Sequence, residues 1–140
     1  PAEPCTSARA GEPLAVLVLD NDPLTVEATS ALLATMGHVP VGAFTPEAAR
    51  AQAGRVDAVL ADFRLDATGP GCEGRAGGED GLDVVASLRA LCPGLPALLI
   101  TAECDPAIRL RAEGMGIPMH AKPIAPAVIE GFVAGVRPRA

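Results

Sequence analysis

The sequence has very few aromatic residues: it contains no tryptophan and no tyrosine, and aromatic residues make up 2% of its 140 positions. A hydrophobic core must therefore be built from aliphatic side chains, which are abundant because 49% of the residues are hydrophobic. That fraction excludes a disordered chain. A chain of this length corresponds to one domain and can bury about two-thirds of its unfolded surface.

Basic residues are also in short supply, because 11 Lys and Arg stand against 17 Asp and Glu, for a formal net charge of −6. Binding to nucleic acid needs clustered cations, so we expect no direct contact with nucleic acid. No apolar run approaches the roughly 20 residues of a membrane-spanning helix, and no secretory signal is recognisable. These absences predict a cytoplasmic domain that makes no membrane contact itself.

The four cysteines are irregularly spaced and contain no CxxC pair, which argues against a zinc site or a disulfide framework. We interpret them as reduced thiols. They are Cys5, Cys72, Cys92 and Cys104. The two histidines, His38 and His120, have no ligand partner at a recognisable spacing, and we interpret both as structural.

Short apolar runs alternate with helical patterns along the chain. The runs are too short for buried helices and predict strands at 15–19, 39–43, 56–61, 97–100 and 117–121. Polar caps, prolines and apolar residues at helical spacing predict a helix after each strand. Five such units predict an α/β fold, in which a five-stranded parallel sheet is doubly wound with helices on both faces.

The first helix is predicted to begin with Asn21 or Asp22 as its N-cap and to end at Gly37. Thr45 and Asp105 are the predicted caps of the second and fourth helices. Apolar residues of the first helix repeat at helical spacing and predict its buried face. They are Leu24, Ala28, Ala31, Leu32 and Met36.

Two segments break this alternation. Residues 1–13 are rich in Pro, Ala and Glu and are predicted to be a linker or tail, which leaves 14–137 as the domain. Residues 67–80 hold five glycines between a strand and its helix, and we interpret them as a mobile insertion. The sequence does not begin with methionine, so we expect it to be part of a larger or processed protein.

Polar residues follow the predicted strands, and the carboxyl ends of parallel strands meet at one edge of the sheet, where ligands bind. These residues are Asp20, Asn21, Asp62, Thr101 and Lys122. Carboxylate and amide oxygens are ligands that Mg²⁺ prefers. A carboxylate beside such a metal can attack phosphorus, while a lysine and a hydroxyl contact the phosphoryl oxygens. The set therefore predicts formation of an aspartyl phosphate.

Four segments resemble the signatures of response-regulator receiver domains, and they occur in that family's order along nearly the whole chain. They are Val16–Pro23, Ala58–Leu65, Leu98–Ala102 and Ala121–Pro123. The resemblance implies a flavodoxin-like (βα)5 fold, with the glycine-rich segment as a local insertion. The wording of these segments is most similar to receivers at the C-terminus of hybrid sensor histidine kinases.

The resemblance also implies a role for the acidic residues at the sheet edge. Asp62 matches the aspartate that accepts a phosphoryl group in this family. Asp20 and Asn21 match the acidic pair that binds Mg²⁺ together with Asp62 and the backbone carbonyl of Arg64.

Thr101 matches the switch hydroxyl of the family, and Lys122 matches its phosphate-binding lysine, with the Lys122–Pro123 peptide bond expected to be cis. The implied phosphoryl donor is a phosphohistidine on a histidine kinase or a histidine phosphotransfer domain. The isolated domain would then be no turnover enzyme, while its parent would be a hybrid histidine kinase that tethers it at a membrane. The sequence leaves open whether the domain forms a homodimer.

Two positions depart from the family pattern. Asn21 stands in place of the second acid, which predicts weaker Mg²⁺ binding and slower phosphotransfer. Met119 stands where a switch aromatic is common, so the usual relay from Thr101 to an aromatic ring is missing. Both features favour an alternative function, a pseudo-receiver that binds a protein partner without being phosphorylated.

A phosphohydrolase of the haloacid-dehalogenase type is a third hypothesis, because Asp20 and Asp22 have the Asp-x-Asp spacing of its nucleophile. That class needs an acidic pair after the lysine, and the only acid beyond Lys122 is Glu130. The chain is also short for a substrate cap. The sequence therefore favours the phosphoacceptor receiver.

Overall fold

The computed structural model describes four segments of the chain, residues 13–65, 80–102, 105–122 and 124–136. The predicted linker and the predicted glycine-rich insertion lie almost entirely outside the described residues, so both remain predictions. The same holds for the cis bond before Pro123 and for three of the four cysteines, Cys5, Cys72 and Cys104.

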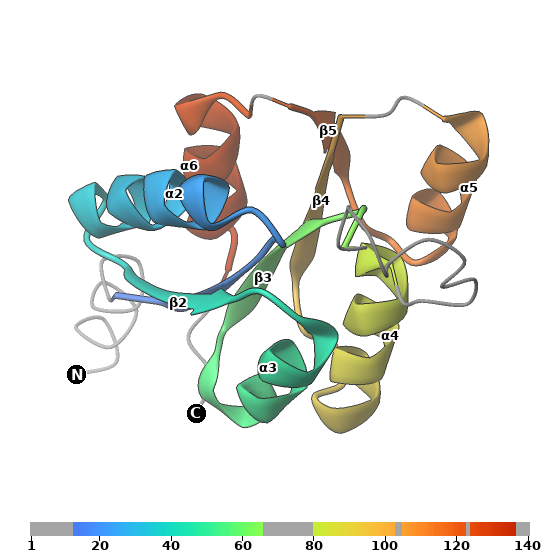
Figure 1. The fold of residues 1–140 in the computed structure, drawn as a ribbon, viewed down its shortest axis with the longest axis horizontal. Helices are drawn as coiled ribbons and strands as arrows, with labels where there is room; N and C mark the ends of the chain where they lie inside the picture. The colour runs from blue at the N-terminus through green and yellow to red at the C-terminus, as the bar shows by residue number, and fades with distance from the viewer. Residues whose placement is uncertain (1–12, 66–79, 103–104, 123, 137–140) are drawn as a thin grey trace, which may run out of the picture.

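The described residues form a three-layer α/β arrangement (Figure 1). One parallel sheet has the order β2-β1-β3-β4-β5, built from β1 Ala15–Leu19, β2 Val39–Ala43, β3 Ala58–Asp62, β4 Ala97–Thr101 and β5 Met119–Ala121. The helices are α2 Pro23–Thr35, α3 Pro46–Ala51, α4 Gly81–Leu91, α5 Pro106–Gly114 and α6 Pro126–Ala134, with a 3₁₀ turn at Ala53–Arg55. This confirms the predicted flavodoxin-like, doubly wound sheet.

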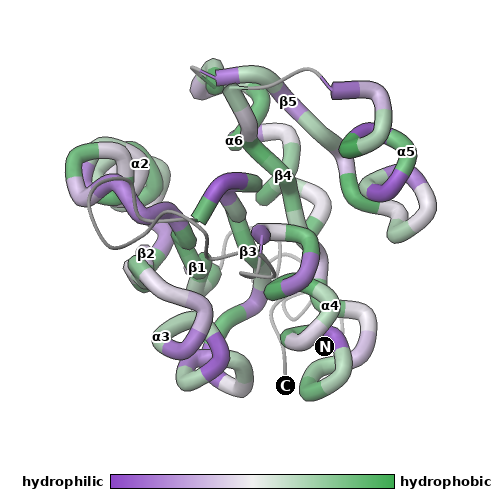
Figure 2. Tube along the Cα trace, turned by 45° about the vertical axis from the view of Figure 1, so that its right-hand side comes forward, coloured by the Kyte–Doolittle hydropathy of each residue, from purple (hydrophilic) through white to green (hydrophobic). Residues whose placement is uncertain are grey.

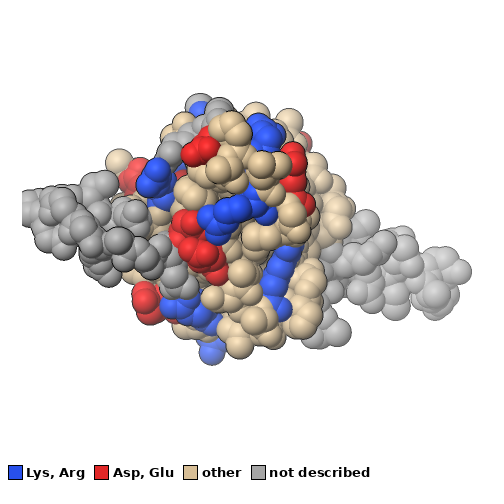
Figure 3. All heavy atoms as spheres, turned by 90° about the vertical axis from the view of Figure 1, so that its right-hand side faces the viewer, with Lys and Arg blue, Asp and Glu red and all other residues tan. Residues whose placement is uncertain are grey.

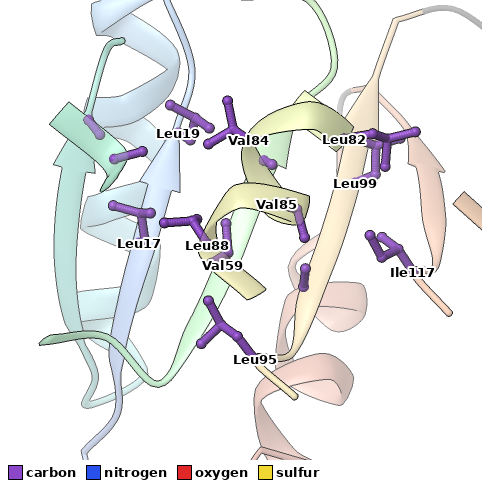
Figure 4. Close-up of a cluster of buried hydrophobic side chains, with 14 of the residues drawn as sticks. Leu17, Leu19, Val59, Leu82, Val84, Val85, Leu88, Leu95, Leu99 and Ile117 are labelled. Atoms are coloured by element: carbon purple, nitrogen blue, oxygen red, sulfur yellow. The ribbon is translucent and has the colours of Figure 1, made fainter. Parts of the chain in front are cut away.

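Helices cover both faces of the sheet, with α2 and α6 on one face and α3, α4 and α5 on the other (Figure 1). Successive residues of β1 point to opposite faces. Leu17 and Leu19 pack in the cluster that includes Leu88 of α4, which Figure 4 shows in close-up. Val16 and Val18 pack in a second cluster with residues of α2 and α6. Both faces of the strand are therefore buried.

Hydropathy follows this layering. Every residue of β3 and of β4 is buried. Figure 2 shows hydrophobic residues along β4, while many of the hydrophilic residues lie in the surrounding helices and loops. None of the described helices is long and apolar enough to cross a membrane.

The predicted helix caps are confirmed. Asp22, Thr45 and Asp105 are N-caps, and each side chain accepts a hydrogen bond from a backbone N–H of the first turn at 2.9–3.2 Å. Gly37 follows α2 with φ +89°, a left-handed conformation that glycine adopts at no steric cost. Local sequence thus determines where the helices begin and where α2 ends.

The predicted buried face of α2 is wrong in part. Leu24 is 73% exposed, and Ala28 and Ala31 are also exposed, whereas Val26 and Leu33 are the buried residues of this helix. Apolar residues occur on more than one side of α2, so helical spacing alone does not select the side that faces the sheet. The helix packs on the sheet through its Val26 and Leu33 side, seven residues apart.

Two strands are shorter than predicted. β3 begins at Ala58, and the preceding residue Asp57 contacts β1 twice: its side chain accepts a hydrogen bond from the N–H of Ala15 at 2.8 Å, and its own N–H donates to the carbonyl of Ala15 at 2.6 Å. β5 begins at Met119, because the N–H of Ile117 donates to the carbonyl of Ala112 at 2.8 Å and so closes the end of α5. Both strands therefore begin two residues later than the apolar pattern predicts.

Two smaller predictions concern His38 and Cys92. The Nδ1 atom of His38 accepts a hydrogen bond from the backbone N–H of Leu14 at 3.1 Å, which confirms a structural role for this histidine. Cys92 is a buried free thiol, and its Sγ atom lies 3.1 Å from the carbonyl oxygen of Ala53.

Candidate functional site

Four of the predicted site residues lie together at the carboxyl edge of the sheet. Asp20 directly follows β1, Asp62 ends β3, Thr101 ends β4 and Lys122 directly follows β5. Asp20, Asp62 and Thr101 are 3%, 6% and 1% exposed, and they are the buried polar residues among those the structure describes. Buried polar groups at one edge require partners, and the partners identify the site.

The ammonium group of Lys122 joins the two buried carboxylates. Its Nζ atom lies 3.1 Å from Oδ2 of Asp20 and 3.0 Å from Oδ1 of Asp62. The backbone of Lys122 also donates to the carbonyl of Thr101 at 2.9 Å, which ties the end of β5 to the end of β4. One cation therefore holds together the ends of strands that are far apart in the sequence.

Hydrogen bonds hold both the side chain and the backbone of Asp20. Its second carboxylate oxygen accepts a hydrogen bond from the backbone N–H of Asp22 at 2.9 Å, and its own N–H donates to the carbonyl of Ala43 in β2. Asp22 faces the helix instead, because its side chain caps α2. The structure thus assigns Asp20 to the site and Asp22 to the helix start.

Burial and charge perturb the ionisation of this pair. Burial raises the pKa of the Asp62 carboxyl above its usual range, the charge of Asp20 adds to this, and the hydrogen bond from Lys122 opposes both. Burial acts to lower the pKa of the Lys122 ammonium, but the hydrogen bonds and charges of Asp62 and Asp20 outweigh it, so that this pKa is raised. Lys122 therefore remains a cation at neutral pH.

The chain matches no family model. It is 35% identical over 95 residues to the probable transcriptional regulatory protein TcrX of Mycobacterium tuberculosis, covering 66% of this chain and 36% of that protein. It thus spans just over a third of this curated relative. It is 25% identical to the solved signal receiver domain of a modulated diguanylate cyclase from Desulfovibrio desulfuricans, with a TM-score of 0.70 and coverage of 87% of this chain and 91% of that one.

The chain has the fold of response-regulator receiver domains. The same fold occurs in a response regulator protein from Burkholderia pseudomallei that was solved with a phosphorylated aspartic acid, a calcium ion and citrate. That structure aligns with a TM-score of 0.70 at 22% identity, over 85% of this chain and 65% of that chain.

The donor set at this edge of the sheet fits a hard divalent cation. Among the described residues, no three His, Cys, Asp or Glu side chains gather into a metal cluster. Asp20 and Asp62 supply two buried carboxylates, and the half-buried Asn21 and the exposed Arg64 follow them closely in sequence. Two carboxylates, an amide and a carbonyl are oxygen donors, and Mg²⁺ is commonly bound through one or two carboxylates while keeping several waters.

Gly81 is a residue beside the site that sequence reasoning missed. A Cβ atom at this position would collide with the backbone carbonyl of Asp62. The N–H of Gly81 donates to the carbonyl of Phe63 at 2.8 Å, so the first turn of α4 rests on the backbone of the predicted phosphoacceptor. The available signal was Asp80, three residues before Asp83, which forms a capping box that begins α4 at Gly81.

A groove of about 560 Å³ opens beside the acidic residues of the site. Asp20, Asp62 and Lys122 line one end of it. Its remaining wall is mainly apolar and includes Leu24 and Ala28 of α2. Two of the three α2 residues that were wrongly predicted to be buried, Leu24 and Ala28, therefore line this groove.

Proposed function

We propose that this receiver domain accepts a phosphoryl group from phosphohistidine onto Asp62 and changes conformation to signal. The observation that carries the proposal is the position of the Lys122 ammonium, within 3.1 Å of both buried carboxylates. A half-buried lysine bridging two buried carboxylates at the ligand-binding edge of a parallel sheet is costly to maintain for stability alone. It is suited to a reaction that brings phosphoryl oxygens to the same place.

In the proposed reaction, a carboxylate oxygen of Asp62 attacks phosphorus and forms a new P–O bond. The P–N bond of the phosphohistidine breaks, and the imidazole nitrogen leaves with the electron pair. Asp62 must be ionised to attack, and the adjacent Lys122 favours its charged form. Water later cleaves the acyl phosphate and regenerates the carboxylate, so the domain is not a turnover enzyme in the usual sense.

Asp20, Asn21, Asp62 and the backbone carbonyl of Arg64 are the residues that would hold Mg²⁺. When bound, the ion would neutralise charge on the transferring phosphoryl group. Asp20 is already oriented for such a role, since its carboxylate is fixed by the backbone of Asp22 and by Lys122.

Lys122 and Thr101 would contact the phosphoryl oxygens. Lys122 is the more exposed of the two, at 28% of its side chain, so its ammonium can move from a carboxylate to an incoming oxyanion. Thr101 is 1% exposed and ends β4 directly after Ile100, the residue that pairs with Asp62 in the sheet register. Its hydroxyl group would donate to a phosphoryl oxygen and so carry the change in charge towards α5.

The partner that this reaction requires is a histidine kinase or a histidine phosphotransfer domain. The residues of the sequence motifs support a hybrid sensor kinase as the parent protein. The name of the curated relative, a transcriptional regulatory protein, supports a regulator with a separate output domain instead. The receiver reaction is the same in both settings.

The second candidate function is a pseudo-receiver that binds a protein partner without phosphorylation. Asn21 favours it, because an amide in place of an acid leaves the site with one negative charge fewer. Met119 favours it too, because this half-buried residue of β5 supplies no aromatic ring.

Amide NMR in the presence of Mg²⁺ and beryllofluoride separates the two functions. A phosphoacceptor should show saturable shifts at Asp20, Thr101 and Lys122 that require both Mg²⁺ and beryllofluoride. The shifts should vanish in Asp62→Asn and persist in Asp105→Asn, a matched control that removes an exposed carboxylate but keeps a good N-cap. No shifts in the wild type, or equal shifts in Asp62→Asn, would favour the pseudo-receiver.

A further inference from the structure

Arg111 of α5 contacts three groups on the α4 side of the molecule. Its Nη1 atom lies 2.8 Å from Oδ2 of Asp80, and its Nη2 atom lies 3.2 Å from Oδ1 of Asp83. Its guanidinium carbon lies 6.0 Å from the centre of the Phe63 ring, within the range of a cation–π contact. Figure 3 views the molecule from this side, where acidic and basic side chains lie against one another.

The two carboxylates that Arg111 contacts are the groups that fix the start of α4. Asp80 accepts from the N–H of Asp83 at 2.8 Å, and Asp83 accepts from the N–H of Asp80 at 3.1 Å. This reciprocal pair is the capping box of the helix. Arg111 therefore binds a rigid helix start rather than two independent surface acids.

The start of α4 in turn supports the backbone of the phosphoacceptor. Gly81 follows Asp80, donates to the carbonyl of Phe63, and lies too close to the carbonyl of Asp62 to accommodate a Cβ atom. A continuous set of contacts thus runs from Asp62 through Gly81 and the capping box to Arg111.

The contacts of Arg111 form a network. Exposed ion pairs contribute measurably to stability when several charges interact in this way. Each pair alone is weak, since the side chains of Arg111, Asp80 and Asp83 are 45%, 23% and 47% exposed. The guanidinium fork engages both carboxylates at once and also covers Phe63. Shared donors on one rigid group lose less side-chain entropy per hydrogen bond than separate pairs.

We propose that Arg111 is a positioning residue that couples the position of α5 to the backbone of Asp62 and Phe63. The proposal rests on the proposed function, because it takes Asp62 as the phosphoacceptor. A charge added at Asp62 would displace the adjoining Phe63–Gly81 contact, and the capping box and Arg111 would carry that displacement to α5. Arg109, two residues earlier on α5, forms no ion pair with the described residues and supplies a matched control.

The test compares Arg111→Gln with Arg109→Gln, each of which removes one positive charge from α5. Mg²⁺ and beryllofluoride are added to each variant, and amide shifts are followed along 106–114 and at Asp20. We expect Arg111→Gln to reduce the α5 shifts at least about twofold while the Asp20 shift persists, and Arg109→Gln to behave as wild type. Arg111→Lys should recover part of the response, because an ammonium reaches one carboxylate but lacks the fork. Equal α5 shifts in both Gln variants would overturn the proposal.

A second readout distinguishes failure of this inference from failure of the proposed function. In the absence of any ligand, hydrogen exchange of the Gly81 amide should be about fivefold faster in Arg111→Gln than in Arg109→Gln. If the wild type shows no amide shifts with Mg²⁺ and beryllofluoride, the proposed function is wrong. The exchange rate of the Gly81 amide then tests the role of Arg111 by itself. Equal exchange of the Gly81 amide in the two variants would then overturn it.

Discussion

At the scale of single residues, the site places two carboxylates around one ammonium group. Asp20 and Asp62 are both buried, and Lys122 is the cation that holds them together at 3.0–3.1 Å. Burial and the neighbouring carboxylate raise the pKa of Asp62, so its ionisation opposes folding. The phosphoacceptor role is therefore expected to reduce stability at neutral pH.

Asp62→Asn tests this directly. Because the folded pKa lies above the unfolded value near 3.8, the folded protein binds more protons between these two values. The stability contributed by protonated Asp62 is lost as the pH rises through the folded pKa. The Tm of Asp62→Asn minus that of wild type should therefore increase from about pH 4 to about pH 7. Far-UV circular dichroism is the suitable probe for a chain without Trp or Tyr. A difference that shrinks over this range would contradict the account.

Asn21→Asp restores the acid that the family pattern expects. A second charge beside Asp20 should tighten Mg²⁺ binding about tenfold, because carboxylates bind this ion more strongly than amides do. Titration calorimetry with Mg²⁺ alone measures the effect, and Asp62→Asn in the same background serves as the control that removes a ligand. Unchanged affinity in Asn21→Asp would exclude residue 21 from the metal site.

At the scale of elements, the start of α4 is the part of the site that the strand pattern does not reveal. Gly81 has no space for a side chain beside the carbonyl of Asp62, whereas Gly131 within α6 has nothing within 4 Å of an added Cβ. Position 81 therefore has space only for glycine, whereas position 131 has space for a side chain, although both lie in helices.

Gly81→Ala should destabilise the domain by about 1–3 kcal/mol, because overpacking forces the backbone of Asp62 or of α4 to shift. Gly131→Ala should leave stability unchanged or raise it by up to about 1 kcal/mol, since alanine is the better helix former. Urea unfolding of both variants measures the difference. A Gly81→Ala variant as stable as wild type would show that the close approach is relaxed in solution.

Sequence reasoning succeeded at the elements that local chemistry determines. The caps Asp22, Thr45 and Asp105 and the carboxyl-edge positions of Asp62 and Lys122 follow from short patterns. The orientation of α2 did not, because its apolar residues lie on several sides and only the shape of the sheet selects Val26 and Leu33. Contacts between elements could not be predicted from the sequence either, because residues such as Arg111 and Asp80 are 31 positions apart in the chain.

At the scale of the whole molecule, the sheet order brings four separate strand ends to one edge. The alternation of strands and helices was sufficient to predict this arrangement, because it indicates a parallel sheet and the carboxyl ends of parallel strands lie at one edge. The fold alone does not distinguish a phosphoacceptor from a pseudo-receiver, since both would keep the same core. That distinction depends on Asn21 and on the chemistry of Asp62.

The most direct measurement is the intact mass of the protein after incubation with acetyl phosphate and Mg²⁺. If Asp62 is the phosphoacceptor, wild type and Asp105→Asn should each gain one phosphoryl group that requires Mg²⁺, and Asp62→Asn should gain none. Peptide mapping should locate the group on the β3 segment that ends at Asp62. No gain in mass at saturating Mg²⁺, or the same gain in Asp62→Asn, would contradict the central claim that Asp62 is the phosphoacceptor.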